Sequence, residues 1–156
     1  MAPAKTMNEH QLAIIHLTRD WLGTPYHHQQ SLKGHGCDCL GLVRGVFEEY
    51  YKTKIQPIPP YSREWADVSK TETLINAAAE HLIRKEPAAR TPGDVLLFRF
   101  RRWMVAKHAG ILVTPTTMIH AIEGAKVSEV HVGPWWQRHL AAVFAFPSKE
   151  QSKMKD

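Results

Sequence analysis

The sequence has 156 residues and a formal net charge of +5, with 44% hydrophobic and 22% charged residues. These globular proportions fit one domain, and they exclude a disordered, collagen-like or low-complexity protein. No apolar run approaches the ~18 residues that span a membrane, so no membrane insertion is expected. The N-terminal segment also lacks the apolar core of a signal peptide, so ordinary secretion is not expected.

A first helix is predicted over Asn8–Leu22, because Asn8 can cap it and apolar residues recur at helical spacing. Gly23 ends this helix, and Pro25 prevents it from resuming. The polar segment Tyr26–Gly36 that follows is predicted to be a loop.

A second helix, the clearest in the sequence, begins at Cys39 with Asp38 as its N-cap. Its apolar positions follow the i, i+3, i+4, i+7 pattern of a helix with one buried face. They are Cys39, Leu42, Val43, Val46, Phe47 and Tyr50. Gly41 and Gly45 lie on successive turns, so a neighbouring element can approach that side of the helix closely.

A third helix is predicted from the capping box Ser69-x-x-Glu72 through Leu82, with Arg84 and Lys85 in its last turn. Beyond it, strand patterns separated by turn signals follow one another. The predicted strands are Val95–Phe100, His108–Val113, Met118–Ile122, Val127–Val132 and Ala141–Phe146. Helices followed by consecutive strands indicate an α+β fold with a C-terminal antiparallel sheet of about five strands. One domain is expected over residues 1–148, with a disordered charged tail over 149–156.

Cys39 is the first candidate for chemistry, because it occupies the first turn of the second helix. The free N–H groups and the partial positive charge at this end lower the pKa of a thiol and can hold an oxyanion. A cysteine placed there is suited to nucleophilic catalysis. The alternative is a buried cysteine that packs as a small hydrophobic residue.

A thiol nucleophile needs a base, and His108 and His120 are the candidates. They lie on neighbouring predicted strands, and their numbers have the same parity. An even hairpin register would place both side chains on one face of the sheet. One imidazole could then act as the base while the other orients it. The alternative is that both histidines are satisfied by backbone groups.

Metal binding by His35, Cys37 and Cys39 competes with this interpretation, but C-x-C with one histidine matches zinc-site spacing poorly. Both cysteines are interpreted as thiols, and no metal or cofactor is expected. The basic, aromatic loop Arg99–Trp103 is expected to contact substrate carboxylates or a partner protein, or to be simply solvated. Nucleic-acid binding is not expected, because no wide basic surface or known module is present.

Five short motifs occur in a specific order along the chain. They are Gly23-Thr24-Pro25-Tyr26, Gly36–Val43, Pro92–Val95, His108–Ile111 and Ile119–Ala121. The ordered set resembles the NlpC-type peptidoglycan peptidases, which are papain-like cysteine peptidases, over roughly residues 10–147. Pro134–Trp136 and Phe144–Pro147 resemble the branch found with phage tails and gene-transfer agents.

This resemblance implies that Cys39 is the nucleophile, His108 the general base and His120 the orienting third residue. Tyr26, Asp38 and Leu40 are assigned by it to the oxyanion and substrate region. Most of the family has serine where this chain has Leu40, which exchanges a hydroxyl contact for an apolar one. The implied substrate is the bond between D-γ-glutamate and a diamino acid in the peptidoglycan stem peptide.

The resemblance and the missing export segment together predict delivery by a phage tail or gene-transfer-agent particle. The protein would be made in the cytoplasm, held at the tail tip or baseplate by another tail protein, and act on the wall in the periplasm. Three alternatives stay open. They are an inactive structural tail-tip component, an amidase or acyltransferase on the same scaffold, and a cytoplasmic enzyme that recycles released stem peptides.

Overall fold

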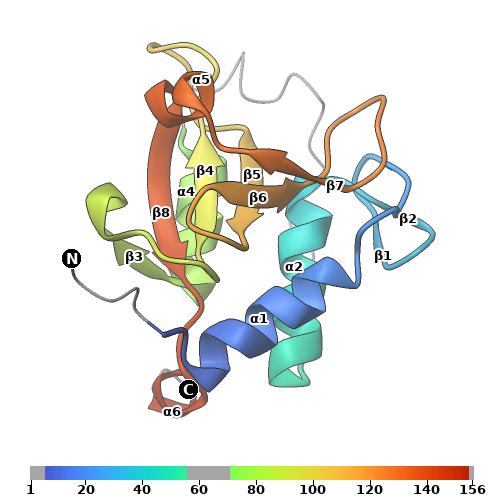
Figure 1. Ribbon diagram of the computed structural model, residues 1–156, viewed down its shortest axis with the longest axis vertical. Coiled ribbons are helices and arrows are strands. Elements are labelled where there is room, and N and C mark those ends of the chain that lie inside the picture. The colour runs from blue at the N-terminus through green and yellow to red at the C-terminus, as the bar shows by residue number, and fades with distance from the viewer. Residues whose placement is uncertain (1–5, 56–70, 155–156) are drawn as a thin grey trace.

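The computed structural model describes residues 6–55 and 71–154 (Figure 1). The N-terminal elements are α1 (Glu9–Arg19), β1 (Ser31–Leu32), β2 (Gly36–Cys37), α2 (Cys39–Tyr51) and α4 (Thr73–His81). The C-terminal elements are β3 (Ile83–Lys85), the 3₁₀ turn η1 (Pro87–Ala89), β4 (Val95–Phe98), β5 (His108–Leu112), β6 (Thr117–His120), β7 (Ser128–His131), α5 (Pro134–Arg138), β8 (Leu140–Ala145) and α6 (Lys149–Met154). This order confirms an α+β fold with N-terminal helices and a C-terminal sheet.

The main sheet has six strands in the order β3-β8-β4-β5-β6-β7, and every pairing is antiparallel. All five predicted strands are present, with ends that differ by at most two residues. The sixth, β3, is where the sequence predicts the end of the third helix. That part of the prediction is wrong, because Leu82 turns to extended backbone and Ile83–Lys85 pairs with β8. Lys85 then donates to Asp94 at 2.7 Å, so its ammonium group pairs with a carboxylate instead of the C-terminal end of a helix.

The start of the third helix also differs from the prediction. Ser69 of the predicted capping box lies outside the described residues, and α4 begins at Thr73 with Glu72 as its N-cap residue. The Glu72 side chain makes no cap bond and accepts instead from Arg99 Nη1 at 3.0 Å. In the predicted register Glu72 would be the third helical residue, and the observed start removes that role.

The C-terminal segment is a short helix where the sequence predicts a disordered tail. Helix α6 begins after Ser148, whose hydroxyl accepts from the Gln151 backbone N–H at 3.1 Å. The Gln151 side chain accepts in return from the Ser148 N–H at 2.8 Å, which completes a capping box. Lys149 Nζ lies 4.8 Å from the centre of the Tyr50 ring, so the helix is held against α2.

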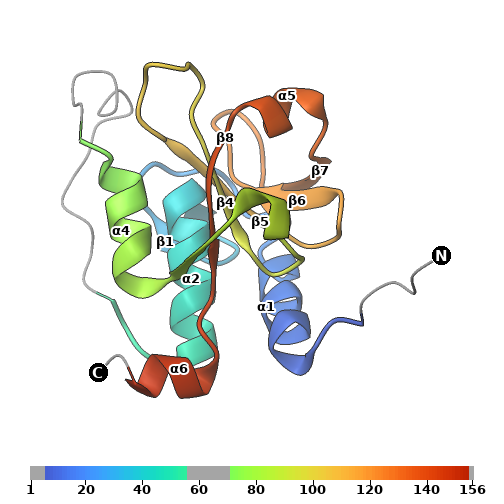
Figure 2. The ribbon, with the colours of Figure 1, turned by 90° about the vertical axis from the view of Figure 1, so that its left-hand side faces the viewer.

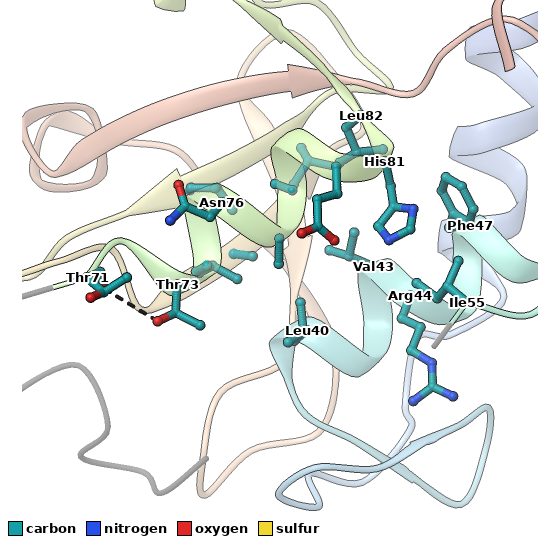
Figure 3. Close-up of a pocket in the computed structure, with 17 residues that line it drawn as sticks. Leu40, Val43, Arg44, Phe47, Ile55, Thr71, Thr73, Asn76, His81 and Leu82 are labelled. Carbon is teal, nitrogen blue, oxygen red and sulfur yellow. Dashed lines mark hydrogen bonds between the residues drawn. The ribbon is translucent and has the colours of Figure 1, made fainter. Parts of the chain in front are cut away.

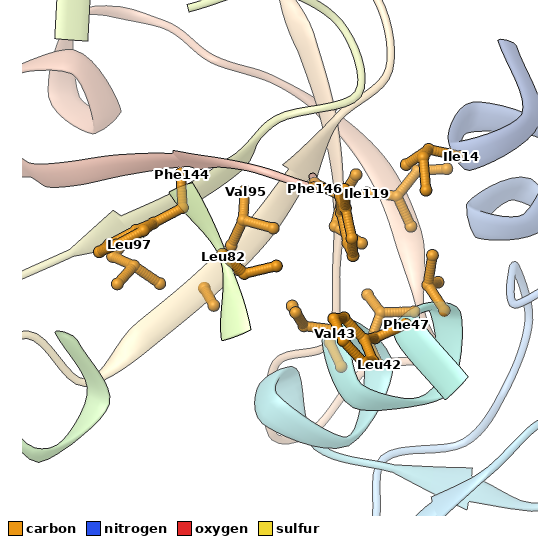
Figure 4. Packing of buried hydrophobic residues seen from close by; sticks show 14 of the residues in the cluster. Ile14, Leu42, Val43, Phe47, Leu82, Val95, Leu97, Ile119, Phe144 and Phe146 are labelled. Atoms are coloured by element: carbon orange, nitrogen blue, oxygen red, sulfur yellow. The ribbon is translucent and has the colours of Figure 1, made fainter. Parts of the chain in front are cut away.

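The sheet is buried on both faces, as the four fully buried residues of β4 show. Alternate residues such as Val95 and Leu97 face α1, α2 and α4 in the larger hydrophobic cluster (Figure 4). Leu96 and Phe98 face a smaller cluster against which Trp136 of α5 packs. Figure 2 shows α2 and α4 on one side of the central strands and α5 on the other. No described helix is long and apolar enough to cross a bilayer.

Candidate active site

The start of α2 is fixed by Asp38. Its backbone is extended, and one carboxylate oxygen accepts from the Gly41 N–H at 2.7 Å. The other oxygen accepts from the Gln29 N–H at 2.7 Å, which ties the preceding loop to the same residue. A Cβ on Gly41 would lie 1.8 Å from the Gln30 carbonyl oxygen, so only glycine permits this approach. Asp38 therefore positions Cys39 by holding both the helix and the loop.

The two histidines are joined by a buried hydrogen bond. Gly110 of β5 pairs with His120 of β6, and this even register places His108 and His120 on one face, as predicted. His108 Nε2 lies 2.9 Å from His120 Nδ1. The side chains are 5% and 4% exposed. The bond occupies one nitrogen of His108 and leaves its Nδ1 for another partner.

The sulfur of Cys39 lies against β5 at the backbone N–H of Ala109, the residue that follows His108. Backbone N–H groups of Ala109, Leu40 and Cys39 itself contact it and lower its pKa. Burial has the larger effect and, together with the nearby Asp38 carboxylate, raises the pKa of Cys39 to about 12. The sequence predicts a lowered pKa from the helix N-terminus, and that prediction is wrong for the resting protein. Loss of solvation raises the pKa of Cys39 by more than the three backbone N–H groups lower it.

The pKa of His108 moves in the opposite direction. Burial, together with the smaller effect of neighbouring His120, lowers the pKa of His108 to about 3. Burial also lowers the pKa of His120. Both shifts favour the uncharged forms, a thiol on Cys39 and a neutral imidazole on His108.

One small cleft of about 190 Å³ contains most of the predicted site. Its lining residues are Tyr26, His28, Asp38, Cys39, Leu40, Leu74, Phe100, Lys107, His108, Ala121, Ile122 and Glu123. Tyr26 reaches it because its backbone forms a bridge with Cys37, immediately before the helix. His120 lies behind His108, outside the lining. Of the basic loop, Phe100 lines the cleft whereas Trp103 is 79% exposed.

Comparison with protein families identifies the domain. A model of the NlpC/P60 family matches residues 23–144. The chain belongs to the NlpC/P60 family. A comparison with curated proteins finds no match.

Solved structures share the NlpC/P60 fold. The NlpC/p60 domain of the peptidoglycan hydrolase SagA is 18% identical with a TM-score of 0.60, over 89% of this chain and 99% of that one. The peptidoglycan hydrolase RipB of Mycobacterium tuberculosis is 17% identical with a TM-score of 0.59, over 94% and 69% of the two chains. An NLP/P60 family protein of Staphylococcus aureus is 15% identical with a TM-score of 0.61, over 95% of this chain. This chain spans only 45% of that longer protein.

Sequence reasoning missed the aromatic rings that enclose the histidines of this NlpC/P60 domain. Phe98 and Phe100 lie 6.2 and 6.0 Å from the His108 ring, between ring centres. The Trp136 ring lies 5.6 Å from that of His108 and 5.4 Å from that of His120. The signal available in the sequence is the Trp135-Trp136 pair after Gly133-Pro134, which places large rings at the start of a short helix.

A larger apolar cavity of about 550 Å³ lies beside the cleft, between α2, α4 and the sheet (Figure 3). Leu40 and Leu74 line both spaces, so they form the wall between them. Leu40 thus presents an apolar surface beside Cys39, where a serine would present a hydroxyl. Cys39 and His108 line the smaller cleft and not the larger cavity.

The metal interpretation finds no geometric support in the part of the chain that the structure describes. Within residues 6–55 and 71–154, no three His, Cys, Asp or Glu side chains gather as metal ligands would. Cys37 is fully buried and belongs to the larger hydrophobic cluster.

Proposed function

We propose that this NlpC/P60 domain is a cysteine peptidase that cuts the stem peptide of peptidoglycan. The observation that carries the proposal is the buried His108 Nε2–His120 Nδ1 contact of 2.9 Å, behind a cleft that also holds Cys39. A candidate nucleophile and a candidate base thus line one cleft, with a second histidine bonded to the base, and this set supports acyl transfer. The names of SagA and RipB as peptidoglycan hydrolases support the choice of substrate.

The hydrogen bond defines which proton moves. For His108 Nδ1 to accept the Cys39 proton, the His108 proton must sit on Nε2 and be donated to His120 Nδ1. His120 then carries its own proton on Nε2. In this arrangement His120 stabilises the imidazolium that forms on His108, without itself taking a proton.

The proposed reaction has two halves. Cys39 Sγ forms a bond to the substrate carbonyl carbon as its proton passes to His108, and the oxyanion is held by the α2 N-terminus with Tyr26. The C–N bond breaks, and the leaving amine takes the proton from His108. Water, deprotonated by His108, then attacks the thioester and releases the carboxylate product and the Cys39 thiol.

The cleft suits a charged peptide. Lys107 and Glu123 line it on the histidine side, and His28 and Asp38 line it on the cysteine side. The stem peptide carries both carboxylates and an amine, so it offers complementary groups. We assign the cut to the bond between D-γ-glutamate and the diamino acid, on the resemblance of the ordered motifs.

Digestion of purified sacculi by the wild-type protein and by Cys39→Ala, with mass analysis of the released fragments, tests the proposal. Fragments that end in D-γ-glutamate, absent with the variant, are the expected result. Release of whole stem peptides from the glycan would instead identify an amidase. No release by well-folded wild-type protein would favour the inactive structural component.

We further propose delivery by a phage tail or gene-transfer-agent particle, with the domain held at the tail tip or baseplate. The support is the resemblance of Pro134–Trp136 and Phe144–Pro147 to that branch. The exposed Trp103 beside Arg101 is the proposed contact with a tail protein. Mass spectrometry of purified particles is expected to detect the chain. Its absence from intact particles and presence in cytosol would favour the stem-peptide recycling enzyme.

A further inference from the structure

We infer that Trp136 is a positioning residue, whose indole shields the His108–His120 hydrogen bond from water and holds His108 in the tautomer that accepts the Cys39 proton. The inference rests on the proposed peptidase function, and its main test does not use activity.

The geometry sets Trp136 apart from the other aromatic rings near the site. Its ring is tilted by 31° over His108, at 5.6 Å between centres. The same ring is perpendicular to His120, at 87° and 5.4 Å. Of the two histidines, Phe98 and Phe100 contact only His108 in the described ring contacts. Trp136 is therefore the ring that spans both imidazoles.

The neighbours of Trp136 fix its place. Helix α5 begins with Pro134, and the partly buried Trp136 packs against the smaller core cluster, where its ring meets Phe98 at 4.8 Å. Trp135 of the same helix is 45% exposed and stacks on His139 at 4.0 Å. It also meets Trp136 at 5.0 Å, but in the described ring contacts it touches neither His108 nor His120. Trp135 is therefore a control for loss of a neighbouring indole without loss of contact with the histidine pair.

Shielding matters because a buried hydrogen bond between two neutral imidazoles is lost when water can replace either partner. With water admitted, His108 can exchange its proton between Nε2 and Nδ1, and the Nδ1–H form cannot accept from Cys39. The perpendicular Trp136 ring also restricts rotation of His120, whose Nδ1 must face His108.

Other ionisable groups also face His108 and must be held constant in any comparison. They are Cys39 and Asp38 at the start of α2, His120 on β6, and Lys107, Glu123 and His28 around the cleft. Substitutions confined to α5 leave all of them in place.

The test compares Trp136→Ala, Trp136→Phe and the control Trp135→Ala by ¹⁵N NMR of the histidine rings from pH 4 to 8. In wild type we expect His108 to stay neutral across most of this range, with its proton on Nε2. In Trp136→Ala we expect both tautomers of His108 and titration shifted upward, toward the ~6.5 of a free imidazole. Trp136→Phe is expected to keep most of the wild-type tautomer and titration of His108. Trp135→Ala is expected to keep both unchanged.

Activity provides a second measurement. The acid limb of kcat/KM is expected to shift upward by a unit or more in Trp136→Ala, with about a tenfold loss at pH 7, and to stay in place in Trp135→Ala. An unchanged His108 tautomer and titration in Trp136→Ala, or an equal change in Trp135→Ala, would overturn the inference. Should Trp136→Ala not fold, Trp136→Leu takes its place, because leucine fills part of the space but carries no ring over the two imidazoles. An unchanged His108 tautomer and titration in that variant would likewise overturn the inference. A protein without peptidase activity leaves the NMR comparison intact.

Discussion

At the scale of single residues, the proposed mechanism depends on a nucleophile and a base whose environments both favour the uncharged form. Burial raises the pKa of Cys39 and lowers the pKa of His108, so charge separation must accompany attack on the substrate. The backbone N–H groups at the sulfur then act mainly on the charged species that forms during the reaction. The helix N-terminus thus contributes to the transition state more than to the resting thiol.

Cys39→Ala is expected to lower kcat/KM on sacculi on the order of 10⁴-fold or more, because the attacking atom is removed. Cys37→Ala is the matched control, two residues away and also a thiol. Its side chain is buried in the core, so we expect some loss of stability but near-normal activity per folded molecule. Equal inactivation of two folded variants would contradict the assignment of Cys39.

Replacement of the histidines should separate their roles. His108→Ala is expected to lose about 10³- to 10⁴-fold in kcat, because a base is needed in both halves of the reaction. His120→Ala is expected to lose roughly 10²-fold, since it orients and stabilises without accepting a proton. His120→Asn offers an oxygen to His108 Nε2–H, so it should recover part of that loss. A fully active His120→Ala would show that His120 has no orienting role.

At the scale of elements, the position of α2 depends on two glycines that let other segments pack directly on its backbone. Gly41 accommodates the Gln30 carbonyl, and Gly45 lies under the Trp21 ring. The opposite side of α2 packs on β5, which carries His108. The helix is therefore held between the loop that carries Tyr26 and the strand that carries the base.

Gly45→Ala is expected to destabilise the domain, although alanine is the better helix former. The added Cβ would lie 2.1 Å from Cζ2 of Trp21, a large ring that is 2% exposed and cannot move aside freely. Overpacking of this kind costs about 1–3 kcal/mol, which exceeds the gain of up to ~1 kcal/mol in helix propensity. Urea unfolding measures the difference, with His16→Ala, at an exposed position of α1, as a control. A more stable Gly45→Ala would contradict the packing.

The sequence predicts the elements that have a full pattern of their own. Helix α2 shows four turns of apolar spacing with an N-cap and paired glycines, and β5 and β6 show the register that brings the histidines together. Strand β3 has three residues, two of them basic, and exists because β8 offers a free edge. No local pattern reveals such a partner.

The site divides in the same way between local and distant causes. Cys39, His108 and His120 follow from local position and parity, whereas the enclosure by Trp136 depends on how a distant helix folds back. The pKa values are the least predictable feature, because burial depends on all the segments that cover a group. The Ser148–Gln151 capping box is a local signal in the sequence, but too few apolar residues follow it to predict a helix.

At the scale of the whole molecule, the buried histidines make the free energy of unfolding depend on pH. The folded-state pKa of His108, about 3, lies below the ~6.5 of an unfolded chain, so the native state resists a proton that the unfolded state binds. Stability from this source is complete above pH 6.5 and is lost as pH falls toward 3.

We therefore expect the free energy of unfolding to fall by roughly 1.4 kcal/mol per pH unit below 6.5 through His108, with a further contribution from His120. Urea denaturation at pH 7, 6 and 5 measures this slope. His108→Gln is the matched variant, because it keeps the side-chain size approximately and removes the titration. The same slope in both proteins would contradict the burial of a neutral imidazole.

The protonated state of the resting nucleophile also determines how the protein survives oxidants. Peroxide attacks a thiolate far faster than a thiol, and the oxidation products beyond sulfenic acid are not readily repaired. Burial raises the pKa of both Cys39 and Cys37 to about 12, so neither sulfur presents a standing thiolate. On the proposed mechanism, we therefore expect Cys39 to resist peroxide in the resting protein and to gain thiolate character only when its proton passes to His108.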